Sequence, residues 1–178
     1  MVAIFKLLLF TLTCSATPLL RRDVITVEND ITQKIEPQIT TLNKDVNGYP
    51  ASGLNGALAI HSDIQQLVAT VNTATDNIKS TGSFGTVAGT TIVAQFQSIV
   101  PAFLEAIVNL GAQVSDWVNI PGGRQLVLND LEAMNAAFVG YFDAMIGAEP
   151  ILLKAGAVAL KAQVNGAFVA TIAEYTAA

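Results

Sequence analysis

Residues 86–118, TVAGTTIVAQFQSIVPAFLEAIVNLGAQVSDWV, decide the fold of this chain. Apolar side chains recur there every three or four residues, which is the spacing of one face of an α-helix. At about 100° per residue they cover about 140° of arc, so we predict one helix that packs against several others as the central element. Pro101 lies opposite this face and predicts a bend without a break. The face consists of Ile92, Val93, Phe96, Ile99, Val100, Phe103, Ile107, Leu110, Val114 and Trp117.

Two segments with the same helical spacing precede this stretch. The first extends from about residue 23 to 46, and Pro37 on its polar side predicts a kink in a helix that continues. The second extends from Ser52 or Gly53 to about Lys79, and turn-forming sequences, NGYPASG and STGSFG, follow the two segments. The predicted buried faces are Val24, Val27, Ile31, Ile35, Ile39, Leu42 and Val46 in the first segment and Leu54, Leu58, Ile64, Val68, Val71 and Ile78 in the second.

Two more helices are predicted after the deciding stretch. The fourth follows IPGG and ends at GAEP, and the fifth begins near Pro150, a residue that suits a first helical turn. Alternation with a period of two, the mark of a β-strand, is sustained nowhere. We therefore predict an all-α fold, an antiparallel bundle of about five long amphipathic helices. The last two faces are Val127, Leu131, Met134, Phe138, Phe142 and Met145, and Leu153, Ala157, Leu160, Val164, Phe168 or Ala167, Thr171 and Tyr175.

The N-terminal residues have the organisation of a secretory leader. Residues 1–16, MVAIFKLLLFTLTCSA, carry one lysine, a short apolar run and small residues that suit signal peptidase. Residues 17–22 then form a short pro-segment that ends in the dibasic pair Arg21-Arg22, a processing site, although a solvated basic pair is the alternative. Residues 23–178 remain as a single helical-bundle domain. No segment stays apolar for the ~20 residues that spanning a membrane needs, so we predict no transmembrane segment.

Charge and cysteine content restrict the partners and the means of stabilisation. Removal of residues 1–22 takes away three basic residues and no acidic one, so the formal net charge falls from −5 to −8. Nucleic acids and anionic membranes are bound by clustered Lys and Arg, so neither is an expected partner. The only cysteine, Cys14, belongs to the leader. The secreted domain must therefore be stabilised by its core and not by disulfides.

The chain lacks the residue combinations on which catalysis depends. It contains one histidine and no motif of a metallohydrolase, a serine hydrolase or a nucleotide-binding site. His61 and Asp63 are two residues apart and project from different sides of a helix, so they cannot act together. We predict no enzymatic activity, no cofactor and no metal. Four acidic residues of the first helix are interpreted as a solvated face: Asp23, Glu28, Asp30 and Glu36.

The apolar surplus, 52% hydrophobic residues against 13% charged, indicates a hydrophobic ligand or surface. His61 and Thr75 are placed in the apolar face of the second helix, and a histidine there is either a satisfied core residue or a polar contact inside a cavity. Aromatic and methionine side chains of the third and fourth helices would either close the core or line a gap that suits an acyl chain. The candidate ligand-binding residues are His61, Thr75, Phe96, Phe103, Met134, Phe138, Phe142 and Met145.

The fifth helix carries a second apolar face opposite its heptad-like seam. A helix that is hydrophobic all round is usually core, so we expect this face to be buried. The alternative is that it meets an apolar partner. The candidate surface-adsorption residues are Val158, Ala162 and Val169.

The leader, the dibasic pair, the stretches RRDVITVENDITQKI (21–35) and VLNDLEAMNAAFVGYFDAMIGAEP (127–150), and the final alanine-rich helix resemble the fungal hydrophobic-surface-binding protein A family. Its members are also described as cell-wall galactomannoproteins. The resemblance covers residues 23–178 and implies a secreted, non-enzymatic helical domain. It implies either fatty-acid binding between the helices or adsorption to hydrophobic surfaces with recruitment of polyester- or cutin-degrading hydrolases. Because the chain stops at AEYTAA, we expect free secretion or loose cell-wall association.

Three functions remain open from the sequence. The first is binding of fatty acids or similar lipids in a cavity between helices. The second is adsorption to a hydrophobic surface, with a secreted hydrolase as a partner. The third is inhibition of an enzyme, although helical inhibitors of this kind usually depend on disulfides.

Overall fold

The computed structural model describes residues 17–178, and helices make up 88% of these described residues, with no strand among them. The all-α prediction is confirmed. One bent helix comprises α1 (Thr17–Asn29), η1 (Asp30–Ile35) and α2 (Glu36–Gly48). Five helices follow it: α3 (Gly53–Thr81), α4 (Thr86–Ala112), the short α5 (Val114–Val118), α6 (Gly123–Ala148) and α7 (Lys154–Ala177). The predicted signal peptide, residues 1–16, lies outside the described residues.

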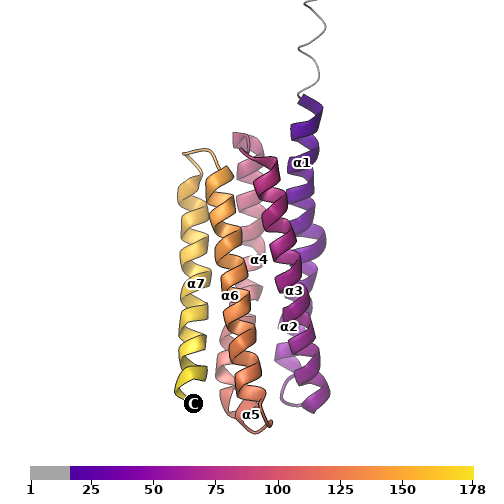
Figure 1. Cartoon of the computed structure of the whole chain (residues 1–178), viewed down its shortest axis with the longest axis vertical. Helices are drawn as coiled ribbons and strands as arrows, with labels where there is room; N and C mark the ends of the chain where they lie inside the picture. Colours follow the sequence, from indigo (N-terminus) through magenta and orange to yellow (C-terminus); the bar gives the residue numbers. More distant parts are fainter. Residues whose placement is uncertain (1–16) are drawn as a thin grey trace, which may run out of the picture.

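The long helices run antiparallel along one axis (Figure 1). We call the upper end in that view, with the α3–α4 loop (82–85) and the α6–α7 loop (149–153), the apical end. The lower end, with the α2–α3 loop, α5 and the C-terminus, is the basal end. The bent helix contacts α3 and α4, α3 contacts α6, α6 contacts α7, and α7 contacts α4. The helices thus form a closed ring, and α4 is one of its members, so the prediction that it is the central element is wrong.

A π-helical segment explains how the first helix passes Pro37. Val27, Ile31, Ile35 and Ile39 are all buried and are spaced by four residues throughout. In a regular α-helix three such steps drift by about 120° around the axis. The wider π-turn of η1, in which Glu36 N–H donates to the carbonyl five residues earlier, offsets this drift. The helix continues past Pro37 as predicted, but it begins at residue 17 and not at 23.

The deciding stretch forms two helices instead of one. Pro101 is accommodated inside α4, as predicted, but the chain turns at Gln113 before α5. The Gln113 side-chain amide donates to the carbonyls of Val46 and Tyr49, at 2.8 and 2.9 Å. The Trp117 ring lies 4.7 Å from that of Tyr49, between centroids. These contacts turn Trp117 under the bundle, so it seals the basal end instead of extending the face of α4.

The buried face of α3 differs from the predicted one. Ile64, Val71 and Ile78 are buried as predicted, whereas Leu54 and Leu58 are exposed and Val68 is only partly buried. Because α3 packs on both the bent helix and α6, its buried face is centred on residues that the prediction left out. These are Ala57, Ile60, Leu67 and Ala74, and Thr75, which the prediction did place in this face, is buried with them.

One face of α7 is exposed, contrary to expectation. The chain turns at Pro150–Leu153 and α7 begins at Lys154, four residues later than predicted. Its heptad-like seam is buried, but Val158 and Val169 are 50% and 56% exposed, and Ala162 is exposed too. The reason is that α7 packs mainly on two helices, α4 and α6. By length and composition, α4 and α7 are apolar enough to cross a membrane, a property that core helices of water-soluble bundles share.

Candidate functional site

Aromatic rings from three helices meet inside the bundle, and we call this group the aromatic cluster. Side chains seven residues apart on α4 and three or four apart on α6 lie on one face of each helix. The closest centroid distances are 4.5 Å for Phe103–Phe138 and 4.9 Å for Phe96–Phe142. Each such pair contributes about 0.5–1.5 kcal/mol beyond the burial of its area. The cluster consists of Phe96, Phe103, Phe138, Tyr141, Phe142 and Phe168, none more than 1% exposed.

Six of the eight predicted ligand-binding residues are collected around this cluster. Four are among the five phenylalanines of the cluster, and Met134 and Met145 are fully buried on the same face of α6. Met134 precedes Phe138 by one helical turn, and Met145 follows Phe142 by one turn. Flexible thioether side chains at both ends allow the cluster to adapt to a shape that rings alone would not fit. The structure thus brings together soft apolar groups along about three turns of α6.

His61 and Thr75 lie elsewhere. The Thr75 hydroxyl is buried and donates to the Val71 carbonyl, at 2.8 Å. His61 is only partly buried, and its Nδ1 lies 2.7 Å from Oδ2 of the buried Asp130 on α6. The prediction placed His61 near the middle of an apolar stripe, and it is wrong because the true stripe of α3 is rotated away from it. An aspartate orients a catalytic histidine in the same way, but among the described residues no hydroxyl or thiol is hydrogen-bonded to His61.

A second buried carboxylate, Asp30, lies beside the aromatic cluster. It accepts hydrogen bonds from Lys34 Nζ and Asn77 Nδ2, both at 2.6 Å. The predicted solvated face is therefore wrong for Asp30, which the π-helical segment carries inward. Close to it, the Tyr141 hydroxyl is buried without a hydrogen-bond partner in the described structure. Burial, and secondly the charge of Asp30, raise the pKa of Tyr141, so its hydroxyl stays protonated and available as a donor.

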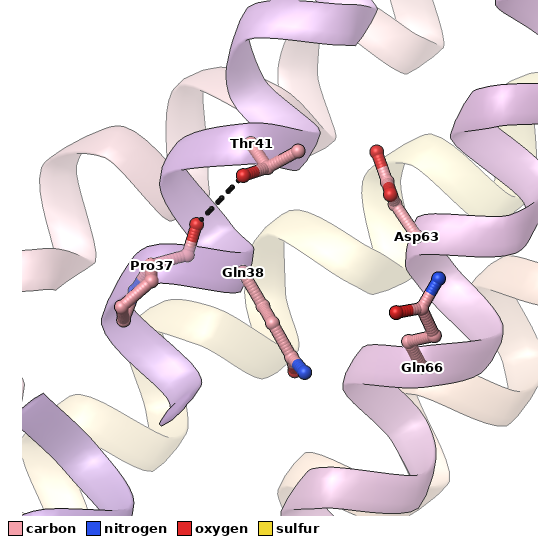
Figure 2. Close-up of a pocket in the computed structure, with 5 residues that line it drawn as sticks. All are labelled: Pro37, Gln38, Thr41, Asp63 and Gln66. Atoms are coloured by element: carbon pink, nitrogen blue, oxygen red, sulfur yellow. Dashed lines mark hydrogen bonds between the residues drawn. The ribbon is translucent and has the colours of Figure 1, made fainter. Parts of the chain in front are cut away.

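A small pocket of about 150 Å³, lined mostly by residues with polar side chains, lies between α2 and α3. Figure 2 shows Gln38 of α2, and Asp63 and Gln66 of α3, directed into the space between the two helices. Burial, and then the charge of Asp45 and a hydrogen bond with it, raise the pKa of Asp63 from 3.8 to about 6. The pocket is therefore a pH-sensitive contact between two helices. Its lining residues are Pro37, Gln38, Thr41, Asp63 and Gln66.

Among the side chains that the structure describes, no group of three or more His, Cys, Asp or Glu is placed to hold a metal ion. The candidate adsorption residues on α7 form an exposed apolar strip, as described above. Sequence reasoning did not include Tyr141, Asp130 or Glu149 among the site residues. Tyr141 follows Phe138 by three residues, which is a signal that it shares the same face. The partners of Asp130 and the burial of Glu149 have no such local signal.

Fold and site together define a helical bundle with an aromatic, apolar interior and an exposed apolar face, which is a class suited to hydrophobic ligands. The hydrophobic surface binding protein A family matches residues 24–147, more than half of the chain. The chain belongs to this family. No curated protein sequence matches it.

Solved structures share the fold. AfMP4p in complex with palmitic acid is 23% identical, with a TM-score of 0.79 over 85% of this chain and 99% of that chain. Ligand binding domain 1 of the Penicillium marneffei MP1 protein, complexed with arachidonic acids, is 16% identical, with a TM-score of 0.77 over 85% and 98%. Ligand binding domain 2 of the same protein, complexed with multiple arachidonic acids, is 17% identical, with a TM-score of 0.76 over 86% and 97%. At these identities the likeness establishes the fold.

Proposed function

We propose that this protein is a secreted, non-enzymatic carrier that binds a fatty acid or a similar long-chain lipid at the aromatic cluster. The observation that carries the proposal is this buried cluster of rings and methionines, in a fold whose solved examples include complexes with palmitic and arachidonic acids. Residues 1–16 support secretion by their composition. Loose cell-wall association is the accompanying expectation.

The energy of burial supports lipid binding without a charged clamp. About fifteen methylenes at about 0.8 kcal/mol each give roughly 12 kcal/mol, against about 4–15 kcal/mol for association. The rings of the cluster contact one another, so an acyl chain has to separate helices and replace ring–ring contacts by ring–methylene contacts. A bundle whose rings slide apart while keeping apolar neighbours loses little burial in this exchange.

The polar head of the ligand has few possible partners. His61 is engaged by Asp130 and lies outside the aromatic cluster. The Tyr141 hydroxyl lies in the cluster and has no partner in the described structure, so it is the better donor. Because Asp30 is close and negative, a fatty acid fits this position better as its neutral acid than as its carboxylate.

Native mass spectrometry of the secreted protein with palmitate tests the proposal. We expect a non-covalent adduct in the wild type and none in Phe103→Trp or Phe142→Trp, because a bulkier ring fills the acyl site. Val108→Trp, which adds the same ring at an exposed position of α4, is the matched control and should keep the adduct. Unchanged binding in both cluster variants contradicts the site.

The same spectra test the predicted processing site, because cleavage after Arg22 gives a chain that begins at Asp23.

A second function, adsorption to a hydrophobic surface with recruitment of a hydrolase, is supported by the exposed strip of α7. Two lysines at Val158 and Val169 would place charge in the adsorbing face, whose transfer from water is then costly. We expect Val158→Lys with Val169→Lys to abolish retention on an alkyl resin at low salt. Val108→Lys, an exposed valine of α4, is the control. Full retention of the double variant rules out this face.

A further inference from the structure

The two ends of the bundle are closed differently. At the basal end, side chains bond to backbone carbonyls of other helices. At the apical end, Phe84 N–H donates to the Ala148 carbonyl at 2.8 Å, but among the described residues no hydrogen bond joins the α6–α7 loop to α4. An end crossed by fewer hydrogen bonds opens at a lower free-energy cost than one crossed by more. The basal bonds run from Gln113 to Val46 and Tyr49, from Arg124 to Tyr175 and Thr176, and from Tyr175 to Leu110.

A buried carboxylate holds the apical loop against α4. Glu149 is 3% exposed, and neither of its carboxylate oxygens has a hydrogen-bond partner in the described structure. The carboxylate lies directly over Gly89, where any Cβ atom would collide with Oε2. Only glycine permits this close approach. Burial raises the pKa of Glu149, so burial in this contact disfavours the charged form of the side chain.

Exposed apolar side chains surround this contact. Val87, Ile151 and Leu152 are 83%, 83% and 85% exposed, the highest values among the large apolar side chains described. We call these three residues the apical tip. Met145, one turn before Glu149 in the sequence, is a residue of the predicted ligand site, and its carbonyl accepts a hydrogen bond from Glu149 N–H at 2.9 Å. The tip, the Glu149–Gly89 contact and the aromatic cluster therefore follow one another from solvent to core.

We propose that the apical end is the entrance through which a long-chain lipid reaches the aromatic cluster, and that the contact of Glu149 with Gly89 is the latch of that entrance. This inference rests on the proposed lipid-binding function. The tip meets the acyl chain first, the α6–α7 loop lifts from α4, and the chain passes Met145 to reach Phe142. The hydrogen-bonded basal end stays closed.

The latch weakens as the pH rises. A charged carboxylate without a partner is not tolerated in an apolar contact, so ionisation of Glu149 favours the lifted loop. No ionisable side chain lies on α4 between Thr86 and Leu104. Uptake should therefore become faster as the pH passes through the raised pKa of Glu149. The charged groups near this end on the surrounding elements include Asp23 and Glu28 of α1, Asp76 and Lys79 of α3, Asp143 of α6, and Lys154 and Lys161 of α7.

The test is stopped-flow uptake of cis-parinaric acid, a fluorescent polyene fatty acid, by the processed protein over a pH series. Gly89→Ala pushes the carboxylate out of its contact and should raise the association rate about three- to tenfold, since uptake is proportional to the open fraction. Glu149→Gln keeps the contact neutral and should be slow at every pH. It also corrects for ionisation of the ligand itself. Gly140→Ala, where a Cβ meets nothing within 4 Å, is the matched control and should behave as the wild type.

Gln113→Ala, which loosens the basal end, distinguishes the two ends. Faster uptake in this variant, with no change in Gly89→Ala, would place the entrance at the basal end and overturn the inference. Equal rates in all variants, with palmitate still bound at equilibrium, would overturn the latch and leave the proposed function standing. If neither palmitate nor cis-parinaric acid binds at equilibrium, the proposed function fails and the entrance fails with it.

Discussion

At the scale of single residues, buried carboxylates occupy the contacts between helices. Asp30 and Asp130 are each held by two hydrogen-bond donors, whereas Asp63 faces Asp45 and Glu149 has no partner in the described structure. Burial raises the pKa of Asp63 and of Glu149, and for Asp63 the charge of Asp45 adds to the effect. Asp63 and Glu149 therefore make the packing of the helices depend on pH.

Asp63→Asn tests this dependence at the α2–α3 contact. Because the pKa of Asp63 is raised in the folded state from 3.8 to about 6, the folded protein binds its proton more tightly than the unfolded chain does. The free energy of unfolding should thus fall as the pH rises through this window, and the fall should be smaller in Asp63→Asn. Urea denaturation at a series of pH values measures it. Asp76→Asn, an exposed acid of the same helix, should keep the wild-type profile, and an identical profile in Asp63→Asn contradicts the assignment.

At the scale of elements, hydrogen bonds from side chains decide where helices end. The apolar spacing continues from α4 into α5 without interruption, so nothing in the periodicity marks a break at Gln113. The side-chain amide of Gln113 bonds to two carbonyls at the end of α2, which are far away in the sequence. This contact draws the chain out of the axis of α4 and lets Trp117 cover the basal end.

Gln113→Ala should lower the free energy of unfolding by about 1–3 kcal/mol, because two hydrogen bonds to partly buried carbonyls are lost. The fluorescence of Trp117, the only tryptophan, should report the change directly. Denaturant titration followed by that fluorescence measures both. Gln97→Ala, an exposed glutamine of α4, is the control for helix propensity. Equal free energies of unfolding of Gln113→Ala and Gln97→Ala would show that the hydrogen bonds of Gln113 do not stabilise the turn between α4 and α5.

At the scale of the whole molecule, the bundle is a closed ring of helices whose basal end is held by more hydrogen bonds between helices than its apical end. The basal end joins four helices through hydrogen bonds from side chains to carbonyls, and the apical end is closed by one backbone hydrogen bond, from Phe84 to Ala148, and by packing around Glu149. Local opening is expected where few hydrogen bonds cross between elements. A carrier of this construction exchanges its ligand at one end while the other keeps the helices in order.

Amide hydrogen exchange followed by mass spectrometry tests this difference. Peptides that cover residues 145–156 and 84–92 should exchange faster than peptides from 108–118 and 44–50, after correction for intrinsic rates. Raising the pH through the raised pKa of Glu149 should widen the difference, and Glu149→Gln should remove that widening. Faster exchange at the basal peptides would contradict the inference that the apical end opens more readily than the basal end.

Local spacing was enough to predict the helices and most of the candidate site. The phenylalanines of α4 and α6 share faces by their separation along the chain, so their burial followed from periodicity. The error at α3 has a different origin. Leu54 and Leu58 lie on an apolar face of α3 next to the face that is buried. Periodicity shows which residues share a face, but it does not show which face packs against a neighbouring helix.

The sequence by itself determined that the chain is helical throughout, that about five long helices form, and that its aromatic side chains face inward, because these depend on contacts a few residues apart. Only the tertiary structure decided which side of α7 faces solvent, that Asp130 holds His61 from 69 residues away, and that Glu149 lies over Gly89. Those contacts depend on the order in which helices pack around the ring. No local pattern encodes that order, since each helix offers more than one apolar face.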